Sequence, residues 1–254
     1  SVALTGVNSI NWGRILAQVV YYFTAALSLG GPDRAVSFAV PTGNFGDILA
    51  GYVAKKMGLP IDRLLIATNI NDILVRTLQT GRYEVTGVTE TTAPSMDIQV
   101  SSNFERLLFE TLQRDGAAVQ RLMASLNQSG AFTLSPQALA LIAEDFDAAR
   151  TTPSQTAQTI KQALQQSGYL LDPHTAIGLF AARQNRTAAT PIVTLGTAHP
   201  AKFPDAVEAA CGTRPTLPAW QGDLMTRAER QQTLANDLQS VEDFISAHAR
   251  VTKT

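Results

Sequence analysis

Cysteine, histidine and lysine are all scarce in this sequence of 254 residues. One cysteine, Cys211, excludes an internal disulfide and is typical of a reducing compartment. With only three histidines and one cysteine in the whole chain, a structural zinc site is not expected. We therefore expect neither a disulfide framework nor a bound metal.

Long apolar runs and blocks of like charge are missing as well. The longest apolar stretch, 15–29, is interrupted by polar residues and is too short to span a bilayer. The net charge is -1, and no basic cluster suggests a nucleic-acid surface. With 45% hydrophobic residues, the composition indicates a globular protein. Neither a membrane nor a nucleic acid is expected as a partner.

Short apolar segments alternate with helical patterns. Residues 35–40 and 63–67 are predicted to be buried strands, followed by helices at about 48–57 and 71–79. A further buried strand is predicted at 191–195. Strand–helix repeats at this spacing are typical of right-handed crossovers in a parallel sheet. The predicted fold is therefore α/β, an open and mostly parallel sheet flanked by helices.

The rest of the chain is predicted to be mainly helical. Asn11 is expected to cap a helix that runs to about Leu29, and Asp172 to cap one that begins at Pro173. We expect the α/β domain to occupy 1–215, with a helical insertion at about 103–170, and a helical extension to occupy 216–254.

A glycine-bearing turn follows the first predicted strand. Residues 41–47 read Pro-Thr-Gly-Asn-Phe-Gly-Asp, and a helix is expected directly after them. Such a junction collects unpaired amides and the positive end of a helix dipole, so Gly43, Asn44, Phe45 and Gly46 are candidates for binding a phosphate. The turn lacks the dinucleotide glycine pattern and the P-loop lysine. The pattern alone leaves phosphate binding and a plain tight turn both open.

Two other segments carry candidate binding residues. Arg14 lies in the first turn of a predicted helix, where the dipole disfavours a cation, so a nearby anion explains it better. The loop after the strand at 191–195 carries Thr197, His199 and Lys202. Since ligands bind at the carboxyl ends of parallel strands, this loop and the glycine turn are expected to share one site.

Five ordered segments resemble threonine synthase of the bacterial and fungal branch. They span residues 8 to about 210 and are Asn8–Arg14, Val40–Asp47, Ser95–Arg106, Leu171–Ala176 and Thr197–Phe203. The resemblance implies a fold-type-II pyridoxal-phosphate enzyme with a tryptophan-synthase-β-like sheet. Its implied reaction converts O-phospho-L-homoserine and water to L-threonine and phosphate, and its implied location is cytoplasmic. The oligomeric state stays open.

The resemblance also assigns roles to individual residues. Gly43, Asn44, Phe45 and Gly46 are implied to hold the phosphate of pyridoxal 5'-phosphate (PLP), and Thr197 to meet its pyridine nitrogen. Arg14, Asn8, Ser9 and Lys202 are implied to contact the phosphate or carboxylate of the substrate.

One departure from the family pattern concerns lysine. The family carries its Schiff-base lysine in a serine- and aspartate-containing context well upstream of the glycine turn, whereas the lysines of this chain are at 55, 56, 161, 202 and 253. No catalytic residue is therefore assigned here. The chain also opens on apolar sequence without methionine. We expect a C-terminal portion of a threonine synthase that lacks the N-terminal domain, binds PLP weakly and is inactive alone.

Two other interpretations compete with this one. A non-catalytic relative could hold a phosphorylated metabolite without chemistry, and it predicts that no catalytic lysine lies upstream. A nucleotide-binding domain could use the same turn, but it predicts an acidic residue after the second strand, where Ala67-Thr68-Asn69 stands.

Overall fold

The computed structural model describes residues 5–185 and 190–249 of the chain. The chain divides into two units, and Asn8–Thr216 forms the larger one. The remaining described residues, 5–7 and 217–249, are assigned to the other unit. The predicted boundary near residue 215 stays a prediction.

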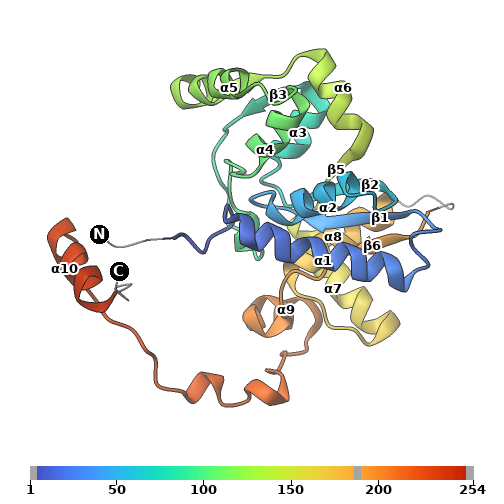
Figure 1. Ribbon diagram of the computed structural model, residues 1–254. Coiled ribbons are helices and arrows are strands. Elements are labelled where there is room, and N and C mark those ends of the chain that lie inside the picture. The colour runs from blue at the N-terminus through green and yellow to red at the C-terminus, as the bar shows by residue number, and fades with distance from the viewer. Residues whose placement is uncertain (1–4, 186–189, 250–254) are drawn as a thin grey trace. The chain divides into compact units, whose positions relative to one another are not determined.

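A four-stranded parallel sheet lies at the centre of the larger unit (Figure 1). Its order is β5 (Phe146–Arg150), β2 (Ile61–Thr68), β1 (Val36–Pro41) and β6 (Ile192–Thr194). All three strand pairs are parallel. This arrangement confirms the predicted α/β class with an open, mostly parallel sheet.

The two faces of the sheet bury alternate residues of the same strands. Phe38 and Val40 of β1 belong to a cluster with α1 (Trp12–Ser28) and α2 (Gly46–Lys56). Ala39, between them, packs on the opposite face with residues of α8 (Pro173–Gln184). Because successive side chains of a strand point to opposite faces, one apolar run is buried between two helical layers.

The remaining helices and strands of the larger unit surround this sandwich. α7 packs against α8 and against α9, and a two-stranded antiparallel sheet pairs β3 with β4. The bounds of these elements are α3 (Ile73–Thr80), β3 (Arg82–Glu84), α4 (Phe104–Thr111), α5 (Gly116–Ser129), β4 (Ala131–Thr133), α6 (Pro136–Asp145), α7 (Pro153–Ser167) and α9 (Pro204–Cys211), with short 3-10 turns at Pro94–Met96 and Pro200–Lys202.

The predicted helical insertion at 103–170 is wrong in one respect, because it contains β4 and β5. β5 pairs with β2 and forms an edge of the main sheet. Its position is fixed by Arg63 of β2, whose guanidinium donates to both carboxylate oxygens of Asp147 at 2.7 and 2.6 Å. The same guanidinium donates to the carbonyl of Phe146 at 3.0 Å. These contacts join residues more than 80 positions apart.

The two predicted helix caps are confirmed. Asn11 caps α1 by accepting from the amide of Gly13 at 2.9 Å, and Asp172 caps α8. α2 begins at Gly46, two residues before the predicted start, because Phe45 is a left-handed residue with φ 64° that ends the turn. The glycine turn is therefore tighter than predicted.

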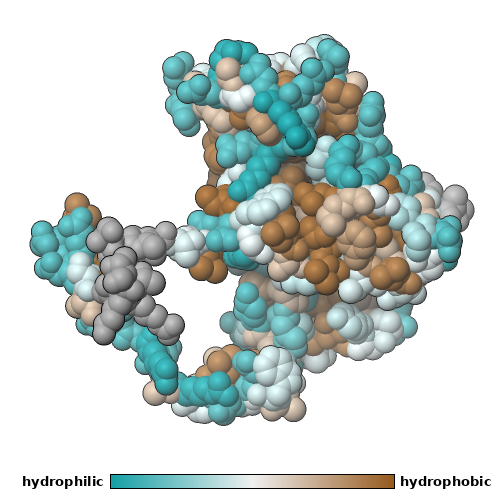
Figure 2. Space-filling model, in the orientation of Figure 1, coloured by the Kyte–Doolittle hydropathy of each residue, from teal (hydrophilic) through white to brown (hydrophobic). Residues whose placement is uncertain are grey.

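α1 carries apolar side chains on its outer face as well as its inner one. Ile15, Val19, Tyr22 and Ala26 are buried against the sheet layer. The outer face exposes other large apolar side chains, and Figure 2 shows brown residues gathered around this part of the molecule. These exposed residues of α1 are Trp12, Leu16, Val20, Tyr21 and Leu27.

The smaller unit contains one helix among the residues described there, α10 (Leu238–His248), preceded by 3-10 turns at Ala219–Gln221 and Leu224–Thr226. Asp237 caps α10 through the amide of Ser240 at 3.0 Å. Over the described parts of the chain, no helix combines the length and the apolar character that crossing a membrane requires.

Candidate functional site

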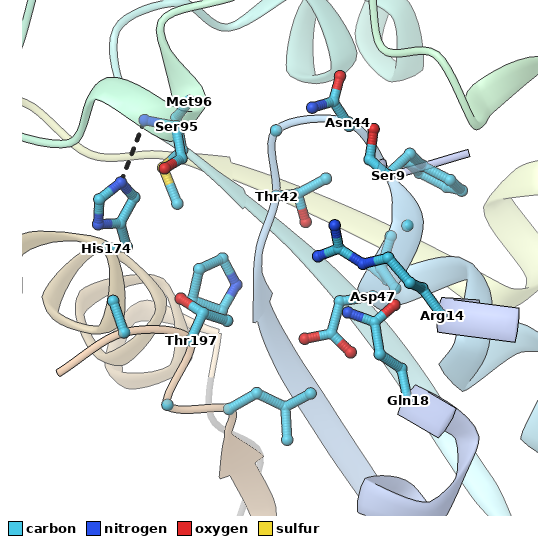
Figure 3. Close-up of a pocket in the computed structure, with 18 of the residues that line it drawn as sticks. Ser9, Arg14, Gln18, Thr42, Asn44, Asp47, Ser95, Met96, His174 and Thr197 are labelled. Atoms are coloured by element: carbon cyan, nitrogen blue, oxygen red, sulfur yellow. Dashed lines mark hydrogen bonds between the residues drawn. The ribbon is translucent and has the colours of Figure 1, made fainter. Parts of the chain in front are cut away.

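A cavity of about 520 Å³ lies at the carboxyl edge of the main sheet (Figure 3). Parallel pairing of Ala39 with Thr194 brings the ends of β1 and β6 to the same edge. The glycine turn and the loop after β6 therefore line one cavity, as the sequence predicted. Its lining residues come from α1, the glycine turn, the 3-10 turn at Pro94–Met96, α8 and the loop after β6: Ser9, Arg14, Gln18, Tyr21, Pro41, Thr42, Gly43, Asn44, Phe45, Gly46, Asp47, Ile48, Ser95, Met96, His174, Leu195, Gly196, Thr197, Ala198 and Lys202.

The glycine turn presents its backbone donors to this cavity. Within the described residues, the amides of Gly43, Asn44, Phe45 and Gly46 have no hydrogen-bond acceptor. Gly46 is also the first residue of α2, whose dipole is positive at this end. Four unpaired amides at a helix N-terminus are suited to an anion with several oxygens.

The carbonyl groups of the same turn are bound by a separate segment. The Ser101 hydroxyl donates to the carbonyl of Gly43 at 2.7 Å. The amide and Nδ2 of Asn103 both donate to the carbonyl of Asn44, at 3.0 and 2.9 Å. Since these acceptors are already occupied, the turn offers donors rather than acceptors to a ligand.

Two residues of the turn are fixed by close packing. A Cβ at Gly43 would overlap the carbonyl oxygen of Ser95, so the chain approaches too closely there for any side chain. Phe45 is left-handed, and its ring is buried against Phe104 and Phe146, with centroids 5.4 and 5.7 Å away. The backbone of Phe45 therefore lines the cavity, whereas its side chain packs in the core.

Thr197, Ser95 and His174 form the wall opposite Arg14 and Asp47 in Figure 3. The amide of Ser95 donates to Nε2 of His174 at 3.2 Å, and the amide of Thr197 donates to Oγ1 of Thr175 at 3.3 Å. Both loops of this wall are therefore attached to the first turn of α8.

Two cations line the cavity. Arg14 points into it from α1, and no ion pair of this residue occurs among the described residues. Lys202 is the other cation of the lining, with its Nζ 5.8 Å from the centroid of the Phe203 ring. Their positive charge, together with the amides of the turn, favours an anionic ligand.

Asp47 is the acidic member of the cavity lining. It follows Gly46 in α2, and the hydroxyl of Tyr22 donates to its backbone carbonyl at 2.8 Å and lies 3.5 Å from Oδ1. Burial raises the pKa of the Asp47 carboxyl from 3.8 to about 6, and the Tyr22 hydroxyl opposes this rise. The carboxyl therefore changes charge near neutral pH.

The structure brings together eight of the ten residues that the sequence suggested: Ser9, Arg14, Gly43, Asn44, Phe45, Gly46, Thr197 and Lys202. Asn8 and His199 are outside the lining: Oδ1 of Asn8 accepts from the amide of Ile10 at 3.2 Å, and Nδ1 of His199 accepts from the amide of Ala201 at 3.1 Å. Sequence reasoning missed Asp47, Ser95 and His174 as cavity residues, although each lies inside a segment it had singled out. Over the described residues, no group of three or more His, Cys, Asp or Glu side chains that could hold a metal ion occurs.

Residues 175–245 match the family described as "Threonine synthase, C-terminal". The chain is 52% identical to threonine synthase of Pseudomonas aeruginosa over 247 residues, covering 96% of this chain and 53% of that protein. The chain belongs to the threonine synthase family. It spans about half the length of the curated threonine synthases of Pseudomonas aeruginosa and Corynebacterium glutamicum.

Solved threonine synthases have the same fold. A PLP-bound threonine synthase from Brucella melitensis superposes with a TM-score of 0.94 at 63% identity, over 98% of this chain and 53% of that one. The yeast threonine synthase gives 0.83 at 39% identity, over 94% and 53%. The sheet is therefore that of the fold-type-II threonine synthases, as the resemblance implied.

Proposed function

We propose that the cavity binds PLP and that the chain provides the phosphate-binding half of a threonine synthase. The reaction would convert O-phospho-L-homoserine and water to L-threonine and phosphate. The observation that carries the proposal is the set of four unpaired amides at the N-terminus of α2, from Gly43 to Gly46. Because the chain spans about half of its relatives, the activity is proposed for a protein that also contains the other half of the fold.

The residues of the cavity fit a cofactor with a phosphate at one end and an aromatic ring at the other. The glycine turn provides donors for the phosphate without competing carbonyls. A volume of about 520 Å³ is within the usual range for cofactor sites. Bound PLP supplies the electron sink for carbanion chemistry, whereas the protein supplies orientation and charge.

Thr197 is the proposed partner of the pyridine nitrogen. Its amide is bound by Thr175, and the residue lies on the cavity wall across from the glycine turn and Arg14. A neutral hydroxyl at this position gives the ring nitrogen a hydrogen-bond partner without stabilising a proton on it, as a carboxylate would.

Binding of PLP to the 254-residue chain tests the cofactor assignment. We expect PLP to bind at least about tenfold more tightly than pyridoxal, which lacks the phosphate, because charge-assisted hydrogen bonds contribute roughly 1.5–3 kcal/mol each. Absorbance titration of both compounds measures the ratio, and inorganic phosphate should displace PLP. Equal affinities for the two compounds would contradict the proposal.

Arg14 is proposed to contact the phosphate or carboxylate of the substrate, with Lys202 and Ser9 nearby. In a full-length threonine synthase carrying this half, Arg14→Ala is expected to raise the KM for O-phospho-L-homoserine by roughly tenfold to a hundredfold, with bound PLP unchanged. Arg121→Ala is the matched control, since Arg121 is an exposed arginine of α5 outside the cavity. An unaltered KM would return Arg14 to a structural role.

Labelling of lysine by reduced PLP distinguishes an enzyme from a non-catalytic relative that binds a phosphorylated metabolite. Lys55 pairs with Asp145 at 2.7 Å, whereas Lys202 lies at the cavity. We propose that borohydride reduction of the PLP-loaded chain leaves Lys202 unlabelled, and that a full-length protein is labelled on a lysine outside this half. Absence of any label in the full-length protein would favour the non-catalytic relative. A cytoplasmic location stays a prediction.

A further inference from the structure

One buried carboxylate is linked, through two neighbouring side chains, to both loops of the wall that carries Ser95 and Thr197. Asp172 is 1% exposed and is the N-cap of α8. It accepts from the amide of His174 at 2.8 Å and from the amide of Thr175 at 3.3 Å. These bonds are ordinary helix capping. The side chains of His174 and Thr175 also point back to the same carboxylate, and capping does not account for that.

Thr175 connects Asp172 to Thr197. The Thr175 hydroxyl donates its single proton to Oδ2 of Asp172. Its oxygen is therefore left as an acceptor, and the amide of Thr197 donates to it at 3.3 Å. Because the proton is already committed, the hydroxyl cannot rotate away without leaving a buried carboxylate oxygen short of a donor.

His174 connects Asp172 to Ser95. Its Nε2 accepts from the Ser95 amide at 3.2 Å, so in the neutral ring the proton is on Nδ1, which lies 3.0 Å from Oδ1 of Asp172. The ring also packs on Phe203, with centroids 4.8 Å apart. Both nitrogens are occupied, so His174 lines the cavity without a free acid or base group.

We propose that Thr175 and His174 are positioning residues that use the carboxylate of Asp172 to fix two loops independently, Thr197 through the Thr175 hydroxyl and Ser95 through the His174 ring. The consequence of this arrangement for cofactor binding rests on the proposed function, in which Thr197 meets the pyridine ring. The Ser95 arm reaches the phosphate end instead, because the Ser95 carbonyl abuts Gly43.

Amide hydrogen exchange on the 254-residue chain tests the two arms without any cofactor. In the unsubstituted chain, the Thr197 amide should exchange more slowly than that of Ala198, which has no acceptor among the described residues. Thr175→Val keeps the shape and removes the hydroxyl, and it should speed exchange at Thr197 roughly five- to tenfold while leaving Ser95 unchanged. His174→Phe keeps an aromatic ring against Phe203 and removes the acceptor of the Ser95 amide. It should speed exchange at Ser95 and leave Thr197 unchanged.

The conservative variant is the control. Thr175→Ser retains the hydroxyl and should restore slow exchange at Thr197. If either variant speeds exchange equally at the Thr197 and Ser95 amides, its role is merely structural and the inference is overturned. So would equal exchange at Thr197 and Ala198 in the unsubstituted chain, a comparison that stands even where a variant does not fold.

Ligand binding provides a second readout. Thr175→Val should weaken PLP binding about fivefold and leave the affinity for inorganic phosphate unchanged, and the effect should vanish in a Thr197→Ala background. If PLP fails to bind the unsubstituted chain, the proposed function fails while the exchange result still decides the inference. If PLP binds but Thr175→Val has no effect, the inference fails and the proposed function stands.

Discussion

Replacing Gly43 by alanine is expected to weaken PLP binding by roughly tenfold to a hundredfold. A Cβ at this position would overlap the Ser95 carbonyl oxygen, which is backbone and cannot rotate away. Either the glycine turn or the 3-10 turn at Pro94–Met96 must move, and overpacking of this kind costs about 1–3 kcal/mol. Movement of the turn also displaces the amides proposed to hold the phosphate.

A second glycine provides the control for this substitution. Gly116 begins α5, and a Cβ there would meet open space. Gly116→Ala should leave both PLP binding and the unfolding midpoint close to those of the unsubstituted chain. Absorbance titration with PLP and urea unfolding of both variants separate loss of binding from loss of folding. If Gly43→Ala bound PLP normally, the proposed phosphate site at this turn would be wrong.

Replacing Asp47 by asparagine is expected to stabilise the chain above pH 7 by up to about 3 kcal/mol. Burial raises the pKa of this carboxyl from 3.8 to about 6, so between these values the folded state holds a proton that the unfolded state has released. Stability therefore falls as pH rises from about 4 to about 6, and the loss persists above that. Each pH unit between the two pKa values corresponds to about 1.36 kcal/mol.

The pH dependence distinguishes this effect from a general one. Asparagine resembles the protonated carboxyl and keeps an acceptor near the Tyr22 hydroxyl, so the two proteins should be equally stable near pH 4 and diverge towards pH 7. Urea unfolding at several pH values measures this. Asp33→Asn is the control, because Asp33 is exposed and makes no ion pair among the described residues. A gain that is constant with pH would mean that Asp47 ionises normally.

The parts of the fold that could be predicted are those encoded locally. β1 and β2 are apolar runs bounded by Gly, Pro and Asn, and Asn11 and Asp172 carry their capping function in the residue type. β5 reads Phe-Asp-Ala-Ala-Arg, with no β-branched residue, and it is a strand because Arg63 binds Asp147 and the Phe146 carbonyl from a neighbouring strand. Nothing local to residues 146–150 signals that contact.

The candidate site divides in the same way. The glycine turn and Thr197 could be predicted to meet, because both follow parallel strands of one sheet. The charge state of Asp47 could not be predicted from the sequence, because it depends on the burial of the carboxyl, which only packing creates. His174 had no visible partner in the sequence beyond Asp172, and its second bond reaches the Ser95 amide 79 residues away.

The left-handed backbone of Phe45 bears on how the glycine turn unfolds. A bulky residue in the left-handed region costs on the order of 1–3 kcal/mol, and here the aromatic core around Phe104 and Phe146 holds it in place. The backbone that presents the amides cannot loosen unless that ring leaves the core. The glycine turn is therefore expected to unfold together with the sheet rather than as a separate loop, and to keep its geometry up to the temperature at which the domain itself unfolds.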